Sequence, residues 1–156
     1  MIAMVKKNYT TEVEGKNVVR GMVKNQAIST KYSVEMARQV KGMTLNDADA
    51  YLDRVLAHQD FLPLIWYRKN IPHRKGASKE GVKSGRYPKK VSIAFKKLIQ
   101  NLKGNAEDKG FNVKKMKIIS AVASGGFRRY KAMKMPGQTK GVKAKSTHVE
   151  MIAREA

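Results

Sequence analysis

Phe127, Arg128, Arg129 and Tyr130 place two guanidinium groups between two aromatic rings. Arginine binds phosphate through paired hydrogen bonds and stacks on bases, while phenylalanine and tyrosine stack on unpaired bases. The alternative is that the two aromatics only complete the pairing of a strand. We favour contact with a polyanion, because two glycines precede these residues and no Asp or Glu occurs between positions 109 and 147.

Two other segments combine proline or glycine with positive charge, namely Pro72-His73-Arg74-Lys75-Gly76 and Gly85-Arg86-Tyr87-Pro88-Lys89-Lys90. Stiff segments of this kind present backbone N–H groups and charge to phosphates. A charge run is more often a solvated helix face, but the glycines and prolines keep these runs off a helix face. The predicted nucleic-acid-binding residues are Arg68, Lys69, His73, Arg74, Lys75, Lys79, Lys83, Arg86, Tyr87, Lys89, Lys90, Phe127, Arg128, Arg129, Tyr130, Lys131, Lys134, Lys140, Lys143 and Lys145.

Catalysis and metal binding find no support in the sequence. The histidines are scattered, at His58, His73 and His148, without ligand spacing or a HExxH motif. The aspartates of residues 47–53 are explained by a helix start and a helix surface. We therefore predict a protein that is not an enzyme and holds no cofactor.

The charge of the chain is strongly positive and unevenly distributed. Its 156 residues carry 33 Lys and Arg against 12 Asp and Glu, a formal net charge of +21. Residues 1–60 have nine basic and seven acidic residues, whereas residues 61–156 have 24 and five, a net charge of +19. Such an asymmetry is typical of a nucleic-acid-binding surface.

Other features of composition limit the setting of the protein. The chain has no cysteine, which excludes a disulfide framework and thiolate metal sites. No apolar run approaches the roughly 20 residues that span a bilayer, and the first residues lack a secretory signal, so we expect a cytoplasmic protein without a membrane partner.

Three helices are expected from apolar spacing. Ser29 or Thr30 caps a helix that runs to Lys41, with Val34, Ala37 and Val40 on its apolar face. The second helix follows a capping box of Thr44 and Asp47, places Ala48, Tyr51, Leu52, Val55 and Leu56 on one face, and ends near Ala57. The third begins with Pro88 as its first residue, buries Val91, Ala94, Phe95, Leu98, Ile99, Leu102 and Ala106, and ends at Gly110.

The remaining segments complete an α+β fold, a small antiparallel sheet packed with three helices plus a long projecting basic β-hairpin. Strands are expected at residues 17–25, 112–123 and 146–154. The chain is then a single domain with a globular body (16–60, 88–122 and 146–155), a basic loop (61–87) and a β-hairpin arm (123–145). Trp66 and Tyr67, at the start of the loop, fit either a base stack or a cover for the core, and the sequence leaves both open.

Several motifs occur in the order found in a known family. Residues 28–31 and 40–42 are similar to the family's Ser-started helix with its basic residue and glycine, and residues 73–76 and 85–91 to the insertion of its archaeal branch. Arg128-Arg129-Tyr130, followed by the closing strand Thr147-His148-Val149-Glu150, completes the match. On these motifs, which span about residues 16–155, the chain resembles the universal large-subunit ribosomal protein numbered twenty-two, in its archaeal and eukaryotic form.

The resemblance implies a ribosomal role. In that family the body binds ribosomal RNA on the subunit surface, and the hairpin penetrates the RNA so that its tip lines the exit tunnel for nascent peptide. The implied partners are large-subunit rRNA, neighbouring ribosomal proteins and, at the tip, the nascent peptide, with a role in subunit assembly. The implied tip residues are Met133, Met135, Pro136, Gly137, Gln138 and Thr139.

The chain departs from the family at this tip. The family usually has Pro-Arg-Ala-x-Gly-Arg, whereas this chain has Pro136 to Val142 without either arginine, which leaves Lys140 as the single charge there. Tip contacts therefore do not transfer residue by residue. Arg128, Arg129, Lys131 and Lys134 are expected to bind phosphate instead.

Two other functions remain open at the level of sequence. A DNA-bending protein could bind the minor groove with a β-ribbon arm. Such proteins usually dimerise, and the sequence shows no evident apolar stripe that would form a dimer interface. A cationic scaffold for an acidic protein would explain the charge but not the glycine-rich arm.

Overall fold

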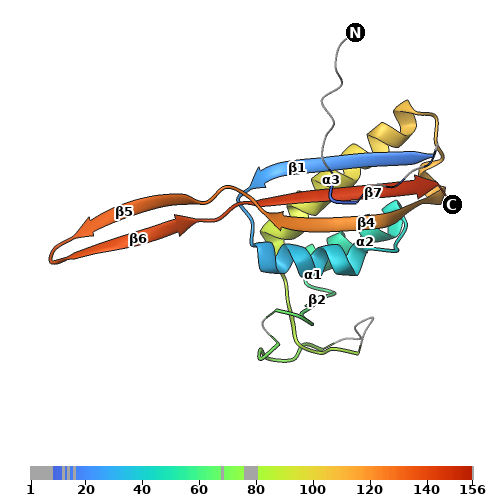
Figure 1. The fold of residues 1–156 in the computed structure, drawn as a ribbon. Helices are drawn as coiled ribbons and strands as arrows, with labels where there is room; N and C mark the ends of the chain where they lie inside the picture. Colours follow the sequence, from blue (N-terminus) through green and yellow to red (C-terminus); the bar gives the residue numbers. More distant parts are fainter. Residues whose placement is uncertain are drawn as a thin grey trace, which may run out of the picture.

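The computed structural model of the chain describes residues 9–11, 13, 15, 17–67, 69–75 and 81–155 (Figure 1). For Met133, Met135, Gln138, Thr139 and Lys140 this description covers the backbone alone. The elements follow one another as one strand, two helices, two very short strands, a long helix and four strands.

A three-stranded antiparallel sheet forms the centre of the body. Its order is β1 (Val18–Gln26), β7 (Thr147–Glu155) and β4 (Met116–Gly125), so the last strand of the chain lies in the middle. Val149, Met151 and Ala153 of β7 are all in the core. The three strands expected at the sequence level are thus confirmed, although a 3-10 turn (Val113–Lys115) takes the first residues expected in the second strand.

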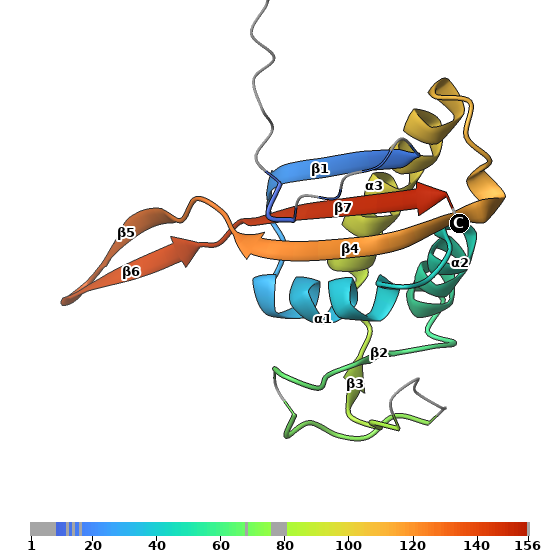
Figure 2. The same ribbon diagram turned by 45° about the vertical axis from the view of Figure 1, so that its right-hand side comes forward.

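The helices pack against this sheet and against one another (Figures 1 and 2). Helix α1 (Thr30–Val40) contacts β4, α3 (Lys89–Asp108) contacts β1, and α2 (Leu45–Leu56) packs on α3. Their apolar faces meet the sheet in a single hydrophobic cluster that includes Phe95, Leu98, Leu52 and Met116. The α+β fold class predicted from the sequence is confirmed.

Helix α1 differs from the prediction in its buried face. Ser29 is the N-cap and the helix ends before Gly42, as expected, but Val34 is only half-buried while Met36, Ala37 and Val40 form the core face. Glu35, on another side of the helix, is also buried. The reason is that α1 lies between the sheet and the basic loop, so more than one of its faces is covered (Figure 2).

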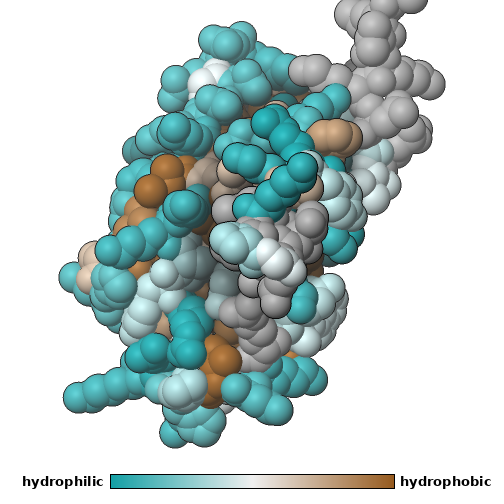
Figure 3. All heavy atoms as spheres, turned by 90° about the vertical axis from the view of Figure 1, so that its left-hand side faces the viewer, coloured by the Kyte–Doolittle hydropathy of each residue, from teal (hydrophilic) through white to brown (hydrophobic). Residues whose placement is uncertain are grey.

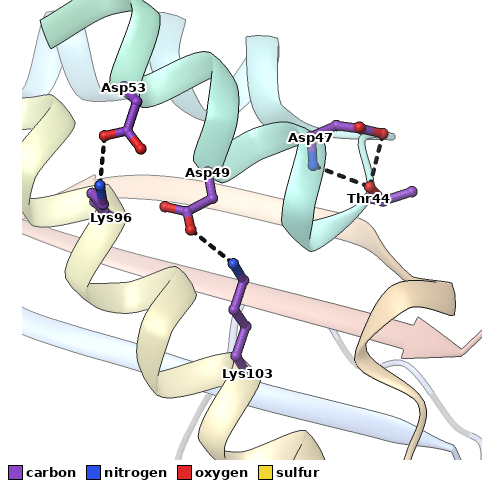
Figure 4. A network of polar contacts seen from close by, with 6 residues as sticks. All are labelled: Thr44, Asp47, Asp49, Asp53, Lys96 and Lys103. Atoms are coloured by element: carbon purple, nitrogen blue, oxygen red, sulfur yellow. Dashed lines mark hydrogen bonds and ion pairs between the residues drawn. The ribbon is translucent and has the colours of Figure 1, made fainter.

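Helix α2 begins with the predicted capping box and is joined to α3 by ion pairs (Figure 4). The Asp47 backbone N–H donates to Thr44 Oγ1 at 3.2 Å, and the Thr44 hydroxyl donates to Asp47 Oδ2 at 2.8 Å. Lys103 Nζ lies 2.7 Å from Asp49 Oδ2, and Lys96 pairs with Asp53. The aspartates of this helix therefore have structural roles, as the sequence indicated.

Helix α3 buries the predicted stripe with two differences. Pro88 is its N-cap and not its first helical residue, so the helix begins at Lys89. Ala94 is half-buried, whereas Ser92, whose hydroxyl donates to the Pro88 carbonyl at 3.3 Å, is fully buried. A hydroxyl that bonds back to its own helix can be buried without an unpaired group, which apolar spacing cannot anticipate. In α2, Leu56 is half-buried in the same way as Ala94.

The β-hairpin arm continues β4 away from the body. Strands β5 (Arg129–Met135) and β6 (Gln138–Ala144) pair from Arg129–Ala144 to Met135–Gln138, which leaves Pro136 and Gly137 as the turn. Gly137 has φ +74, the left-handed region that a turn with proline before glycine requires. In both ribbon views the arm projects from one end of the sheet (Figures 1 and 2).

Candidate nucleic-acid interface

The aromatic residues of the hairpin are exposed to solvent. Phe127 is 69% exposed and Tyr130 is 67% exposed. Tyr130 does pair with Lys143 through the backbone, but its ring stays outside the body, with Lys143 Nζ 5.2 Å from the ring centroid. Completing a strand therefore does not account for these side chains, and their rings are free to stack on bases.

The cationic residues of the hairpin are exposed as well. Arg128, Arg129, Lys131, Lys134, Lys143 and Lys145 all lie on its surface, and the chain has no acidic residue from position 109 to 147. Figure 3 looks at the molecule from the hairpin side and shows a surface on which hydrophilic residues predominate. Uncompensated positive charge on a projecting ribbon favours contact with phosphate groups.

The base of the hairpin is held by a residue that sequence reasoning did not single out. Asn25, at the end of β1, has φ 53, and its Oδ1 accepts a hydrogen bond from the Phe127 N–H at 3.2 Å, while the Ser146 hydroxyl donates to the Phe127 carbonyl at 2.6 Å. The Asn25 N–H donates to His148 Nδ1 at 3.1 Å. A Cβ on Gly126 would come within 2.6 Å of Ser146 Oγ and 2.9 Å of Asn25 Oδ1, so Gly126 alone of the two glycines was a sequence signal for this crossing.

A hollow of about 300 Å³ lies beside this crossing. It is lined by Asn25, Ala27, Phe127, Arg129, Ala144, Lys145 and Ser146. The hollow combines an exposed ring, two cations and several hydrogen-bonding groups.

The basic loop is closed at its base by a second small pairing. Strands β2 (Leu62–Pro63) and β3 (Gly85–Arg86) are antiparallel, and an isolated bridge joins His73 to Ser84. Phe61, Leu62 and Leu64 are buried, so the first residues of the predicted loop belong to the body. A Cβ on Gly85 would lie 2.1 Å from Phe61 Cδ2, which means that only glycine fits this close approach.

An arginine, a tyrosine and a histidine contact one another where the loop returns to the body. The Arg74 guanidinium lies 5.5 Å from the Tyr87 ring centroid, and its Nε donates to the Gly85 carbonyl at 3.3 Å. The rings of Tyr87 and His58 are 4.6 Å apart. These contacts leave Arg74, Arg86 and Tyr87 half-buried, so part of each serves to shape the loop.

The start of the loop is anchored on α1 by a buried carboxylate. Glu35 is 2% exposed, and its Oε1 accepts hydrogen bonds from the backbone N–H groups of Trp66 and Tyr67, each at 2.7 Å. Sequence reasoning missed Glu35, because a single acid within an amphipathic helix carries no signal of a partner 31 residues away.

The predicted binding residues thus fall on two separate surfaces, the hairpin and the basic loop with the start of α3 (Figures 1 and 2). In the loop Lys69, His73, Lys75 and Lys83 are exposed, as are Lys89 and Lys90 of α3. Arg68 and Lys79 lie outside the described residues. Of the predicted tip, Pro136 and Gly137 are exposed, and the side chains of the other members, like that of Lys140, are not described.

Neither a membrane span nor a metal site was found in the part of the chain that the structure describes. None of its helices is both long and apolar enough to cross a bilayer. Within the same residues, no group of three or more His, Asp or Glu side chains is placed to hold a metal ion.

The fold and its surface define a class, that of small basic α+β proteins that present a cationic hairpin and a cationic loop. The chain belongs to the ribosomal protein L22p/L17e family, whose sequence profile matches residues 21–154. It is therefore a structural protein of the ribosome, found in the cytoplasm, and not an enzyme. The resemblance inferred from the sequence motifs is confirmed.

Curated relatives agree with this assignment. The protein named large ribosomal subunit protein uL22 from Methanococcus maripaludis strain C5 is 37% identical over 97% of this chain and 99% of its own length. Its namesake from Ignicoccus hospitalis is 35% identical over 95% of this chain and 96% of its own length. A third, from Haloquadratum walsbyi, is 38% identical over 74% of this chain and 72% of its own length.

Proposed function

We propose that this structural constituent of the large ribosomal subunit binds ribosomal RNA through two surfaces, the basic loop and the β-hairpin. The hairpin would enter the folded RNA with its tip toward the peptide exit tunnel. Both surfaces would help the subunit to assemble, beside neighbouring ribosomal proteins.

The observation that carries the proposal is the hairpin itself. It extends beyond the hydrophobic core, bears exposed cations without an acid between positions 109 and 147, and exposes both aromatic rings of its base. None of the described residues of β5 and β6 belongs to the hydrophobic core. Lys and Arg that replace counterions on RNA allow phosphate-rich segments to approach one another closely.

The two surfaces would act in different ways. The loop is tied to the body by the β2–β3 pairing and by Glu35, which supports a role in fixing the body on the RNA surface. Among the described residues, contacts between the hairpin and the body lie at its base, around Asn25, which supports adaptation of the arm to an RNA cleft. At the tip, Pro136 and Gly137 would face RNA or the nascent peptide, without the arginines that the family usually carries there.

Cell fractionation tests the subunit assignment. A tagged copy of the full chain should migrate with large subunits in a sucrose gradient and remain with them at moderate salt. Recovery on chromosomal DNA, or as a free dimer, would instead support the DNA-bending alternative. Comigration with an acidic protein after ribonuclease treatment would support the cationic scaffold.

RNA binding by the hairpin is tested with a charge-matched pair of variants. Arg128→Ala with Arg129→Ala should leave thermal unfolding unchanged and weaken RNA binding. The slope of log affinity against log salt should become shallower by about 1.4 to 1.8, the share of two phosphate contacts. Lys114→Ala with Lys115→Ala removes the same charge from exposed residues at the opposite end of β4 and should change binding much less. Equal losses in the two variants would show that net charge acts without a hairpin site.

A further inference from the structure

Trp66 and Tyr67 form an exposed aromatic pair that neither the hairpin nor the cationic residues of the loop explain. Trp66 is 60% exposed and Tyr67 is 38% exposed, although residues 61–64 are buried in the body. Each ring has a cation from α1 over it. The Arg38 guanidinium lies 4.7 Å from the Trp66 ring centroid, and Lys31 Nζ lies 5.9 Å from that of Tyr67.

This aromatic pair is held in place by its backbone. Both N–H groups donate to Glu35 Oε1 at 2.7 Å, and Glu35 is buried in α1. Hydrogen bonds to a charged acceptor are stronger than those between neutral groups, and here they fix two successive residues to one helix. The rings are therefore positioned before any ligand arrives, which lowers the entropy lost on binding.

The chemistry of the pair fits a nucleotide. The Trp66 indole stays 60% exposed with the Arg38 guanidinium over its ring, and a base can stack on such an aromatic plane. Lys31 and Arg38 provide two positive charges beside the rings, against the one buried carboxylate of Glu35 that holds their backbone. A protein partner would also bury an exposed tryptophan, but this excess of cations around the rings favours an anionic ligand.

We infer that Trp66, with Arg38 over its ring and Tyr67 beside it, is a stacking site for an unpaired RNA base. It is a third contact, on the α1 side of the loop and separate from the hairpin. This inference rests on the proposed function, because it assumes that the protein binds RNA. Its consequence is that the loop recognises single-stranded RNA through a base as well as through phosphates.

Fluorescence provides a direct test, because Trp66 is the only tryptophan of the chain. The full-length protein is titrated with a ten-nucleotide single-stranded RNA, with a duplex of the same sequence and with heparin, a polyanion without bases. Single-stranded RNA should quench the tryptophan emission to saturation, whereas duplex and heparin should leave most of it. Equal quenching by all three would overturn the inference, because charge alone would then account for the change.

Affinity measurements separate this site from the proposed function. With a dye-labelled single-stranded RNA, Trp66→Ala should weaken binding about 5- to 150-fold, the range of one base–aromatic stack, while Trp66→Phe should retain most of the affinity. Ile93→Ala is the matched control, since Ile93 is an exposed apolar residue of α3 and is not one of the predicted binding residues. RNA binding that persists without tryptophan quenching would overturn the stacking site and leave the proposed function intact. Absence of RNA binding altogether would overturn both.

A protein interface is the remaining outcome. If Trp66→Ala keeps its RNA affinity but loses a crosslink to a neighbouring ribosomal protein in purified subunits, Trp66 is a protein contact and the inference is wrong.

Discussion

Replacement of Gly85 by alanine should destabilise the protein by inserting one methyl group against Phe61. The added Cβ would lie 2.1 Å from Cδ2 of the Phe61 ring, 2.8 Å from Cε2 and 2.9 Å from Cγ. Carbon atoms in contact are ordinarily about 3.5 to 4.0 Å apart. Either the ring or the β3 backbone must therefore move.

Neither group can move freely. Phe61 is buried, its N–H donates to Asp60 Oδ1 at 2.8 Å, and its carbonyl accepts the hydroxyl of buried Tyr51 at 3.1 Å. Gly85 is itself paired with Pro63. Overpacking of a core costs about 1–3 kcal/mol, and this overlap places the cost near about 3 kcal/mol. For a protein of this size the midpoint of thermal unfolding should then fall by about 6–12 °C.

The assay is thermal unfolding followed by circular dichroism, with Gly104→Ala as the control. Gly104 lies within α3, and a Cβ there would meet nothing within 4 Å. The same substitution at that site should raise the midpoint by about 1–4 °C, because alanine favours a helix by about 0.5–1 kcal/mol. The same glycine-to-alanine change should thus lower the midpoint of thermal unfolding at position 85 and raise it at position 104.

A double-mutant cycle shows whether the clash is the cause. In a Phe61→Ala background the ring is gone, so Gly85→Ala should lose most of its effect. An unchanged midpoint for Gly85→Ala alone, or the same cost in both backgrounds, would refute the reasoning.

Three further predictions follow from other contacts. Phe95→Ala should lower the free energy of unfolding by about 3–5 kcal/mol in urea, because the ring is fully buried in α3, while Ile93→Ala should change it by about 0.5 kcal/mol or less. Burial raises the pKa of Tyr51 above its usual 10.0, so the folded state keeps a proton that the unfolded chain releases. The resulting stability is present below pH 10 and is lost as pH rises, by at most about 1.4 kcal/mol per pH unit, and Tyr51→Phe should make this decline shallower. Asn25→Gly keeps the left-handed backbone but removes the acceptor at the hairpin base, so amide exchange at Phe127 should become faster while thermal unfolding of the body changes little.

Each of these has a contradicting result. Equal urea midpoints for the wild type and the Phe95 variant would remove that ring from the core. A stability decline above pH 10 that is the same with phenylalanine at position 51 would mean that Tyr51 is not the group responsible. Unchanged exchange at Phe127 in the Asn25 variant would show that the hairpin base is held by other contacts.

Much of the fold could be predicted because it depends on local rules. Apolar residues at helical spacing gave α2 and α3, and Thr44 with Asp47 gave the start of α2. Each of these signals lies within a few residues of the chain, where apolar spacing and helix capping determine the conformation. The prediction of an exposed cationic arm followed in the same way from the absence of acids.

The contacts that shape the candidate site were of a different kind. Asn25 is hydrogen-bonded to Phe127, which lies 102 residues later in the chain. Glu35 is hydrogen-bonded to Trp66, which lies 31 residues later. The prediction that Val34 lies on the buried face of α1 was also wrong, since Val34 is only half-buried. The loop that covers the opposite side of this helix is remote in sequence, so apolar spacing within the helix did not reveal it.

The sequence by itself determined the charge, the helices, the strands and the family, since these follow from composition, short-range periodicity and ordered motifs. Only the tertiary structure decided which polar groups hold the hairpin and the loop, and that Trp66 lies exposed beneath a cation from α1. The physical reason is that a hydrogen bond or a stacked ring requires two groups to meet within a few ångströms, and chain folding alone brings such distant residues together.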